Sequence, residues 1–185
     1  DYFLFFGEDD LLFFSGNMDP SLFHIGDKVI NYIIDDCGVC PDCKHHHENI
    51  CSNFTKGTAY FNENGFSGFY GFSEYAVVKA RHLYVYPKET PDDEAAFTEP
   101  LACVINSINR SHIKMGDDVV VIGGGVMGLL HVLCAKRQGA RVILSETDAK
   151  RRAFGLKLGA DNVIDPLEFD PVEQVKKLTN GRGAN

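Results

Sequence analysis

Four of the six cysteines lie in one short stretch, CGVCPDCKHHHENIC, as Cys37, Cys40, Cys43 and Cys51. Four thiolates from one loop can surround Zn²⁺ tetrahedrally and leave no coordination position open, which is typical of a structural zinc site. The first three cysteines also match the start of an iron–sulfur motif, but the fourth comes eight residues later and no proline follows it. A zinc ribbon would need two separated C-x-x-C pairs and a basic surface. The spacing therefore predicts one tightly held structural zinc, with free cysteines in a reduced loop as the alternative and His45–His47 as exposed loop residues.

A glycine-rich turn within VVVIGGGVMG, residues 119–128, has the pattern that binds the phosphates of a dinucleotide. In G-x-G-x-x-G the first glycine allows a tight turn, the second lets the backbone approach a pyrophosphate, and the third lets a helix pack close to the sheet. The phosphates would meet free N–H groups at the start of that helix, where the helix dipole favours negative charge. The predicted cofactor-binding residues of this turn are Gly123, Gly125, Val126, Met127 and Gly128. The alternative is a glycine-rich strand–helix turn that binds nothing.

An acidic residue, Glu146, ends the next predicted strand, 18 residues after Gly128. A carboxylate at this place accepts hydrogen bonds from ribose hydroxyls and repels a 2′-phosphate, so it favours NAD over NADP. Arg151 follows five residues later and is predicted to lie along the adenosine, with a solvated helix position as the alternative. Lys150 and Arg152 flank it, and this basic triplet is the competing reader of the ribose, because it would attract a phosphate.

The elements that position these residues change in character near the middle of the chain. Short β segments, KVINYII, YAVVKA and LYVYP, alternate with loops rich in Gly, Asn and Ser between residues 28 and 87. Helix formers interrupted by Pro100 follow over 92–112. Strands and helices then alternate: strands over 118–123, 141–146 and 161–166, and helices over 126–137, 148–158 and 171–179. This alternation predicts an α/β fold with a parallel sheet, the first domain covering residues 1–104 and the second 105–185.

Composition limits the partners and the compartment. The chain has 185 residues, is 44% hydrophobic and carries a net charge of −8, which disfavours nucleic acid and anionic membranes as partners. The N-terminal DYFLFFGEDDLLFFSG has acidic interruptions and no basic segment before it, so it is predicted to be neither a signal peptide nor a membrane span. Clustered cysteines without a secretory signal favour metal binding in a reducing compartment, and we predict a cytoplasmic protein.

Taken together, several stretches resemble the zinc-dependent medium-chain dehydrogenases, in particular the sorbitol (polyol) dehydrogenase branch. They are HIGDKVI, the four-cysteine lobe, GFSEYAVV, EPLACV, VVVIGGGVMG and GARVILSETDAKRR, in consistent order from about residue 22 to 185. The resemblance implies a GroES-like catalytic domain before a Rossmann doubly wound parallel sheet, a structural and a catalytic zinc, and NAD as cofactor. It also implies that Glu99, in EPL, is a catalytic ligand of the second zinc, and that the protein is a homo-oligomer, a dimer or a tetramer. From the residues alone, Glu99 reads as an exposed acid at a helix start. Cys103 and Cys134 are interpreted as packing residues.

The sequence departs from this family at two places. The family supplies two more ligands of the catalytic zinc, a cysteine near the N-terminus and a histidine in a GHE triplet. The corresponding region reads FFGEDDLL, with Gly7 and Glu8 but no histidine, and no cysteine precedes Cys37. TNGRGAN resembles the approach to a fourth Rossmann strand. The expectation is therefore a fragment of a longer dehydrogenase; loss of front segments and a degenerate relative are the alternatives.

The resemblance implies an oxidoreductase that transfers a hydride between a secondary alcohol, polyol or sugar-like, and NAD. The substrate would be a small molecule, and an amino alcohol or a phosphorylated polyol fits the same family. The alternative function is a non-catalytic NAD- and zinc-binding relative that acts as a scaffold or interaction protein.

Overall fold

The computed structural model describes residues 4–5, 22–32, 36–53, 77–78 and 82–185. Contacts divide the chain into two units, Asp1–Ala95 and Ala96–Asn185. Each unit is described by itself below. The domain boundary after residue 104 stays a prediction, and the departures at Gly7 and Glu8 lie outside the described residues.

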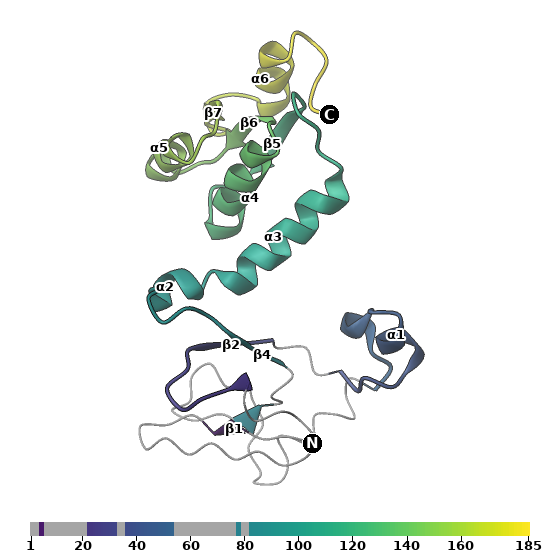
Figure 1. The fold of residues 1–185 in the computed structure, drawn as a ribbon. Helices are drawn as coiled ribbons and strands as arrows, with labels where there is room; N and C mark the ends of the chain where they lie inside the picture. The colour runs from purple at the N-terminus through teal and green to yellow at the C-terminus, as the bar shows by residue number, and fades with distance from the viewer. Residues whose placement is uncertain (1–3, 6–21, 33–35, 54–76, 79–81) are drawn as a thin grey trace. The chain divides into compact units, whose positions relative to one another are not determined.

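The first unit contains short antiparallel strand pairs and a compact cysteine lobe (Figure 1). Strand β1 (Leu4–Phe5) pairs with β3 (Val77–Val78), and β2 (Val29–Asn31) pairs with β4 (Leu83–Val85). The lobe contains α1 (Pro41–Lys44) and the 3₁₀ turn η2 (Glu48–Ile50), and the unit ends with α2 (Asp92–Ala95). The β segments predicted from the sequence thus contain β2, β3 and β4, and the Gly-rich loop predicted over 61–73 lies outside the described residues.

The second unit is a parallel sheet with helices on its faces, as the alternating pattern predicted. The strand order is β5 (Asp118–Ile122), β6 (Arg141–Ser145), β7 (Asn162–Ile164), and both pairings are parallel. The connecting helices are α4 (Val126–Arg137), α5 (Ala149–Lys157) and α6 (Pro171–Leu178). Two of these helices start at an aspartate whose carboxylate accepts backbone N–H groups, Asp148 at α5 and Asp170 at α6. Figure 1 shows this unit in colours from teal through green to yellow.

The central strand β6 is buried on both faces, which accounts for its unbroken apolar run. Val142, Ile143 and Leu144 are all 0% exposed. Val142 and Leu144 belong to a core cluster that includes α3 and α4 side chains, whereas Ile143 packs with Ile164 and with Val175 of α6. A strand between two helical layers needs apolar residues at consecutive positions, because both of its faces lack water.

Helix α3 (Thr98–Ser111) differs from the prediction that Pro100 interrupts it. The break lies earlier, between the end of α2 at Ala95 and the start of α3 at Thr98. Pro100 is the third residue of α3, where a backbone N–H has no partner within the helix, so the proline removes no helical hydrogen bond. Within the part of the chain that the structure describes, no helix has the length and apolar character to cross a bilayer.

Candidate functional site

The four cysteines of the lobe converge on one point. Cys40 caps α1, Pro41 opens that helix at a position that suits proline, and Cys43 lies within it. The Sγ atoms of Cys40 and Cys43 are 3.4 Å apart, those of Cys37 and Cys43 3.9 Å, and those of Cys40 and Cys51 3.9 Å. All four sulfur atoms lie within 4.8 Å of one another, and three of the residues are buried. The predicted ligand set is therefore brought together.

This donor set fits a tetrahedral zinc ion. Zn–S bonds of about 2.3 Å in tetrahedral geometry place the sulfurs about 3.8 Å apart, close to the observed separations. The cysteines are all free, at sulfur separations far longer than the bond of about 2.05 Å that a disulfide needs. Hydrogen bonds from Asn53, then from backbone N–H groups, lower the pKa of the Cys37 thiol to about 6. Burial raises the pKa of the Cys43 thiol to about 12, so a bound cation would be needed to keep it ionised.

The neighbouring histidines, His45, His46 and His47, are exposed and do not belong to this cysteine cluster. His46 has a positive φ of 60° and lies 3.7 Å from Glu48. The prediction that they are exposed loop residues is confirmed.

In the turn between β5 and α4, the fold itself requires glycine at two of the three motif positions and does not require it at the third. Gly123 has φ +94°, a conformation that favours glycine. A Cβ at Gly128 would lie 1.8 Å from the carbonyl oxygen of Gly123, so a side chain there would collide with the turn. A Cβ at Gly125 would meet nothing within 4 Å, and its φ of −71° suits any residue. The second glycine therefore keeps open a space that the described residues do not fill.

The backbone N–H groups at the start of α4 border that space and have no side-chain cap. Gly125 is the N-cap and has no side chain to accept their hydrogen bonds, and the first turn carries no acidic residue. Val126 and Met127 are 57% and 43% exposed, so this end of the helix is accessible. Free N–H groups with the positive end of the helix dipole form an anion-binding site.

Glu146, at the end of β6, is bound to the glycine turn by its own carboxylate. It is 6% exposed. Its Oε2 accepts a hydrogen bond from the backbone N–H of Gly124, and its Oε1 accepts from Asp148 N at 2.7 Å and Thr147 Oγ1 at 3.0 Å. These backbone donors, Asp148 first, lower the pKa of Glu146 to about 2. The side chain is therefore ionised at neutral pH and places a fixed negative charge beside the turn.

Two of the three basic residues that follow Glu146, Arg152 and Arg151, differ in their surroundings. The guanidinium of Arg152 donates to the carbonyls of Glu146 and Thr147, at 2.7 and 2.8 Å, and pairs with Asp165 at 2.7 Å. The guanidinium of Arg152 thus stabilises the backbone at the end of β6. The side chain of Arg151 is exposed, and a Cβ at Gly124 would lie 3.3 Å from its Cβ. Arg151 therefore borders the turn, and its place along the adenosine stays a prediction.

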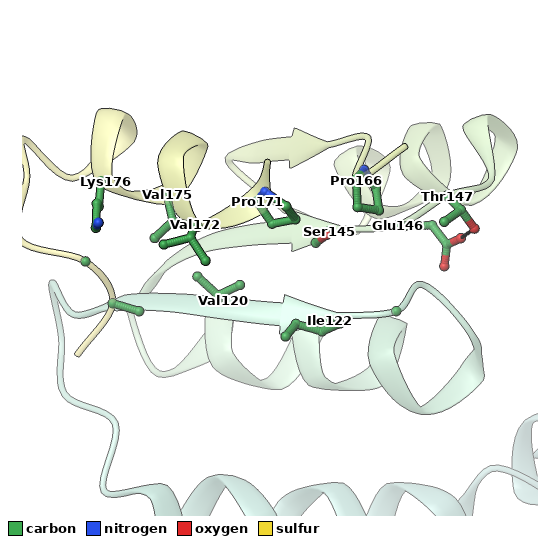
Figure 2. Close-up of a pocket in the computed structure, with 13 residues that line it drawn as sticks. Val120, Ile122, Ser145, Glu146, Thr147, Pro166, Pro171, Val172, Val175 and Lys176 are labelled. Atoms are coloured by element: carbon green, nitrogen blue, oxygen red, sulfur yellow. Dashed lines mark hydrogen bonds between the residues drawn. The ribbon is translucent and has the colours of Figure 1, made fainter. Parts of the chain in front are cut away.

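A hollow of about 480 Å³ adjoins the glycine turn (Figure 2). Glu146 and Thr147 lie at one end of it, Val120 of β5 faces Val172 of α6 across it, and Ile122 lies farther along β5. Ile122 is 86% exposed and Val172 is 60% exposed, so these side chains leave apolar surface open. The contribution of α6 to this hollow has no distinct signal in the sequence, because apolar residues on an amphipathic helix are equally typical of a core. The hollow suits a flat, mostly apolar group attached to a polar one.

Glu99 lies in the first turn of α3 and is exposed. Cys103, one turn later, donates to Glu99 Oε1 from its Sγ at 3.7 Å. The interpretation of Cys103 as a packing residue is wrong, since this side chain is exposed, whereas Cys134 is half-buried against the core as predicted. Among the described residues the cysteine lobe is the one group of three or more metal-ligating side chains, and Glu99 is outside it. The described residues thus bring no further metal-ligating cluster together at Glu99, and its role as a ligand stays a prediction.

Two protein families match the chain, in the order that the resemblance implied. Residues 16–88 match the alcohol dehydrogenase GroES-like domain, and residues 126–185 match the zinc-binding dehydrogenases. The first match covers the cysteine lobe, and the second begins at the first residue of α4. The expected fold class, a GroES-like domain followed by a Rossmann-type parallel sheet, is confirmed.

Individual relatives carry dehydrogenase names. L-threonine 3-dehydrogenase of Thermococcus kodakarensis is 37% identical over 80% of this chain and 40% of its own length. Sorbitol dehydrogenase of Halalkalibacterium halodurans is 36% identical over 88% of this chain and 46% of its own length. A solved structure described as a zinc-binding dehydrogenase from Sinorhizobium meliloti, bound to NADP, has a TM-score of 0.70 at 34% identity and covers 82% of this chain and 42% of that one.

The chain therefore spans less than half the length of these relatives. The expected cofactors, zinc and a nicotinamide dinucleotide, agree with the name of the matching family and with the NADP bound to the Sinorhizobium meliloti relative. The order of the two matches agrees with the order of the two units. The cysteine lobe lies within the first match, and α4, which follows the glycine turn, begins the second. The chain thus carries, in this order, a match to the GroES-like domain of the alcohol dehydrogenases and a match to the zinc-binding dehydrogenases.

Proposed function

We propose that this chain is part of a zinc-dependent oxidoreductase that transfers a hydride between a secondary alcohol and NAD. The observation that carries the proposal is the glycine turn, in which uncapped N–H groups of α4, an unfilled space at Gly125 and the ionised Glu146 lie together. This arrangement supplies donors for a pyrophosphate and an acceptor for a ribose. The adjoining hollow supplies apolar surface for the adenine.

In the proposed reaction the alcohol carbon gives a hydride to the nicotinamide, and the hydroxyl proton passes to solvent, so the alcohol becomes a ketone. The chain holds the adenosine and pyrophosphate, and so fixes the cofactor from which the nicotinamide extends. A catalytic zinc, when bound, supplies Lewis acidity that lowers the pKa of the alcohol. We propose Glu99 as a ligand of that ion, which rests on the family pattern EPL.

We propose a polyol or sugar-like alcohol as the substrate class. The relatives include enzymes named for threonine, for sorbitol and for D-arabitol phosphate, so an amino alcohol and a phosphorylated polyol are the competing classes. We further propose a cytoplasmic homo-oligomer. The test is to measure NAD reduction by the zinc-loaded protein with one substrate of each class.

In the complete parent protein, replacing Glu99 with glutamine is expected to lower kcat/KM at least about tenfold and to reduce zinc from two ions per chain to one, because a neutral amide is a poorer ligand than a carboxylate. Elemental analysis and steady-state kinetics check both effects. Glu94→Gln is the matched control, since Glu94 is an exposed acid in α2, and should keep both values. Full zinc occupancy and full activity in Glu99→Gln would show that Glu99 is not a ligand.

Glu146 is expected to make the protein prefer NAD over NADP by at least about tenfold in kcat/KM, equivalent to roughly 1.4 kcal/mol. Its charge is fixed beside the turn by backbone donors, and a 2′-phosphate would meet it at close range. Glu146→Ser should narrow or reverse the preference. Lys157→Ala is the control, because Lys157 is exposed in the last turn of α5, and it should leave the ratio of the two efficiencies nearly unchanged. Equal efficiencies in the unchanged protein would instead assign cofactor choice to Arg151 and Lys150.

The second candidate function is a non-catalytic NAD- and zinc-binding scaffold. The observation in its favour is that the described residues bring together a complete structural metal site but no second ligand cluster at Glu99. A scaffold would bind NADH and zinc, yet would reduce NAD with no alcohol of any of the three classes. The substrate panel therefore separates the two functions.

A further inference from the structure

We infer that Asn53 is a zinc-anchoring residue, which holds two thiolates of the cysteine lobe through two separate N–H donors. The inference rests on the proposed zinc site and adds to it a residue outside the four ligands. Asn53 follows the last of these cysteines by two positions. No spacing rule for metal ligands points to it.

The two donors of Asn53 reach opposite ends of the lobe. Its side-chain Nδ2 donates to Cys37 Sγ at 3.4 Å, and its backbone N donates to Cys51 Sγ at 3.4 Å. Cys37 is the first ligand in the chain and Cys51 is the last, so one residue closes the lobe by contacting both. Hydrogen bonds to sulfur are longer than those to oxygen, and a nitrogen-to-sulfur separation of 3.4 Å is close enough for a thiolate acceptor.

The sulfur of Cys37 receives more donors than this one. The backbone N–H groups of Val39 and Cys40 donate to it at 3.5 and 3.3 Å. Those two donors are fixed by the turn that leads into α1, whereas the donor from Asn53 depends on the identity of its side chain. Asn53 is therefore a position at which substitution changes the donor set of Cys37 while the backbone donors remain.

The chemistry of a four-thiolate site explains why such donors matter. Four thiolates around one divalent cation carry a net charge of −2, and their mutual repulsion opposes assembly in a buried place. Each N–H donor spreads part of that charge and orients the lone pairs of the sulfur that accepts it. Residues that hydrogen-bond to ligands in this way typically change metal affinity by about 10- to 100-fold when they are replaced.

The test compares Asn53→Asp and Asn53→Leu with the same two changes at Asn49. Aspartate and leucine both approximate the size of asparagine. Both lack its side-chain N–H donor and keep the backbone N–H. Asn49 is exposed in the same lobe, and no bond from it to a sulfur occurs among the described residues. The zinc-loaded protein is titrated with a chromogenic chelator, and we expect the affinity of the structural zinc to fall about 10- to 100-fold in both Asn53 variants. Both Asn49 variants should stay within about twofold of the unchanged protein.

A second readout separates sulfur donation from a general loosening of the lobe. In protein loaded with Co²⁺, loss of an N–H donor raises the energy of the sulfur electrons, so the sulfur-to-metal charge-transfer band should move to longer wavelength in both Asn53 variants. Lower affinity with an unmoved band, unchanged affinity, or equal losses at Asn49 would each overturn the inference. If the unchanged protein binds no zinc at the cysteines, the proposed site itself fails; if it binds zinc and the Asn53 variants match it, only the role of Asn53 fails.

Discussion

Cys40→Ser is expected to empty the structural zinc site and to unfold the cysteine lobe. Cys40 is 7% exposed and its sulfur is 3.4 Å from that of Cys43, so this change removes a central ligand. The lobe has little else to hold it, because its buried hydrophobic cluster consists of the cysteines themselves. For domains of this kind, metal binding supplies much of the folding free energy, about 10–16 kcal/mol in zinc-finger peptides. Losing one of the four ligands should therefore remove most of the stability of the lobe.

The expected loss is measured in two ways. Elemental analysis should show one zinc fewer per chain, and limited proteolysis should cut within residues 37–53 at rates well above those of the unchanged protein. Cys134→Ala is the matched control, because Cys134 is half-buried in the other unit and far from the lobe in sequence. It should keep the full zinc content. Unchanged zinc and unchanged protection in Cys40→Ser would mean that the lobe is held by something other than metal.

The cysteine lobe and the glycine turn were predictable because their constraints are local in the sequence. Four cysteines within fifteen residues have few ways to arrange themselves, and C-x-x-C spacing around a short helix brings Cys40 and Cys43 to one point. The glycine pattern specifies a positive φ at Gly123 and a close contact at Gly128, and both are found. The unbroken apolar run of β6 likewise indicates a strand covered on both faces.

The parts that the sequence did not predict depend on contacts between distant residues or on helix register. The position of Glu146 was expected, but its bond to Gly124 was not, because the two are 22 residues apart and meet only when β5 and β6 pair. Pro100 was read as a break because a proline alone does not show whether it lies in the first turn of a helix or farther along. The amide of Asn53 gave no signal at all, since its partner is 16 residues away.

The role of Arg152 also depends on contacts between distant residues, so the sequence alone does not predict it. In the sequence it belongs to a basic run beside the ribose acid, and so it competes as a phosphate ligand. In the structure its guanidinium is occupied by Glu146, Thr147 and Asp165. The pairing with Asp165 requires β7 to lie beside β6, which is a property of the folded sheet. Arg152 is therefore a poorer candidate for a phosphate ligand than Lys150 or Arg151.

Gly128→Ala is expected to weaken NADH binding at least about 100-fold and to lower Tm as well. A Cβ at this position would lie 1.8 Å from the carbonyl oxygen of Gly123 and 2.9 Å from its carbonyl carbon. Both are backbone atoms of Gly123 and cannot move away as a flexible side chain would, so α4 must shift from β5 and the turn must open. Overpacking of this kind costs about 1–3 kcal/mol, or occasionally more, which corresponds to a fall in Tm of about 5 °C or more. The donors at the start of α4 would then no longer point at the pyrophosphate.

Gly125→Ala is the comparison that separates the fold from the ligand. No atom lies within 4 Å of a Cβ there, and its φ of −71° suits alanine, so Tm should stay within about 1 °C of the unchanged protein. Its NADH affinity should still fall at least about tenfold, because the methyl group would occupy the space through which the backbone approaches the pyrophosphate. Calorimetric titration with NADH and thermal unfolding measure both variants. If Gly125→Ala binds NADH as tightly as the unchanged protein, the cofactor does not approach this turn, because the second glycine has no other reason to be kept free of a side chain.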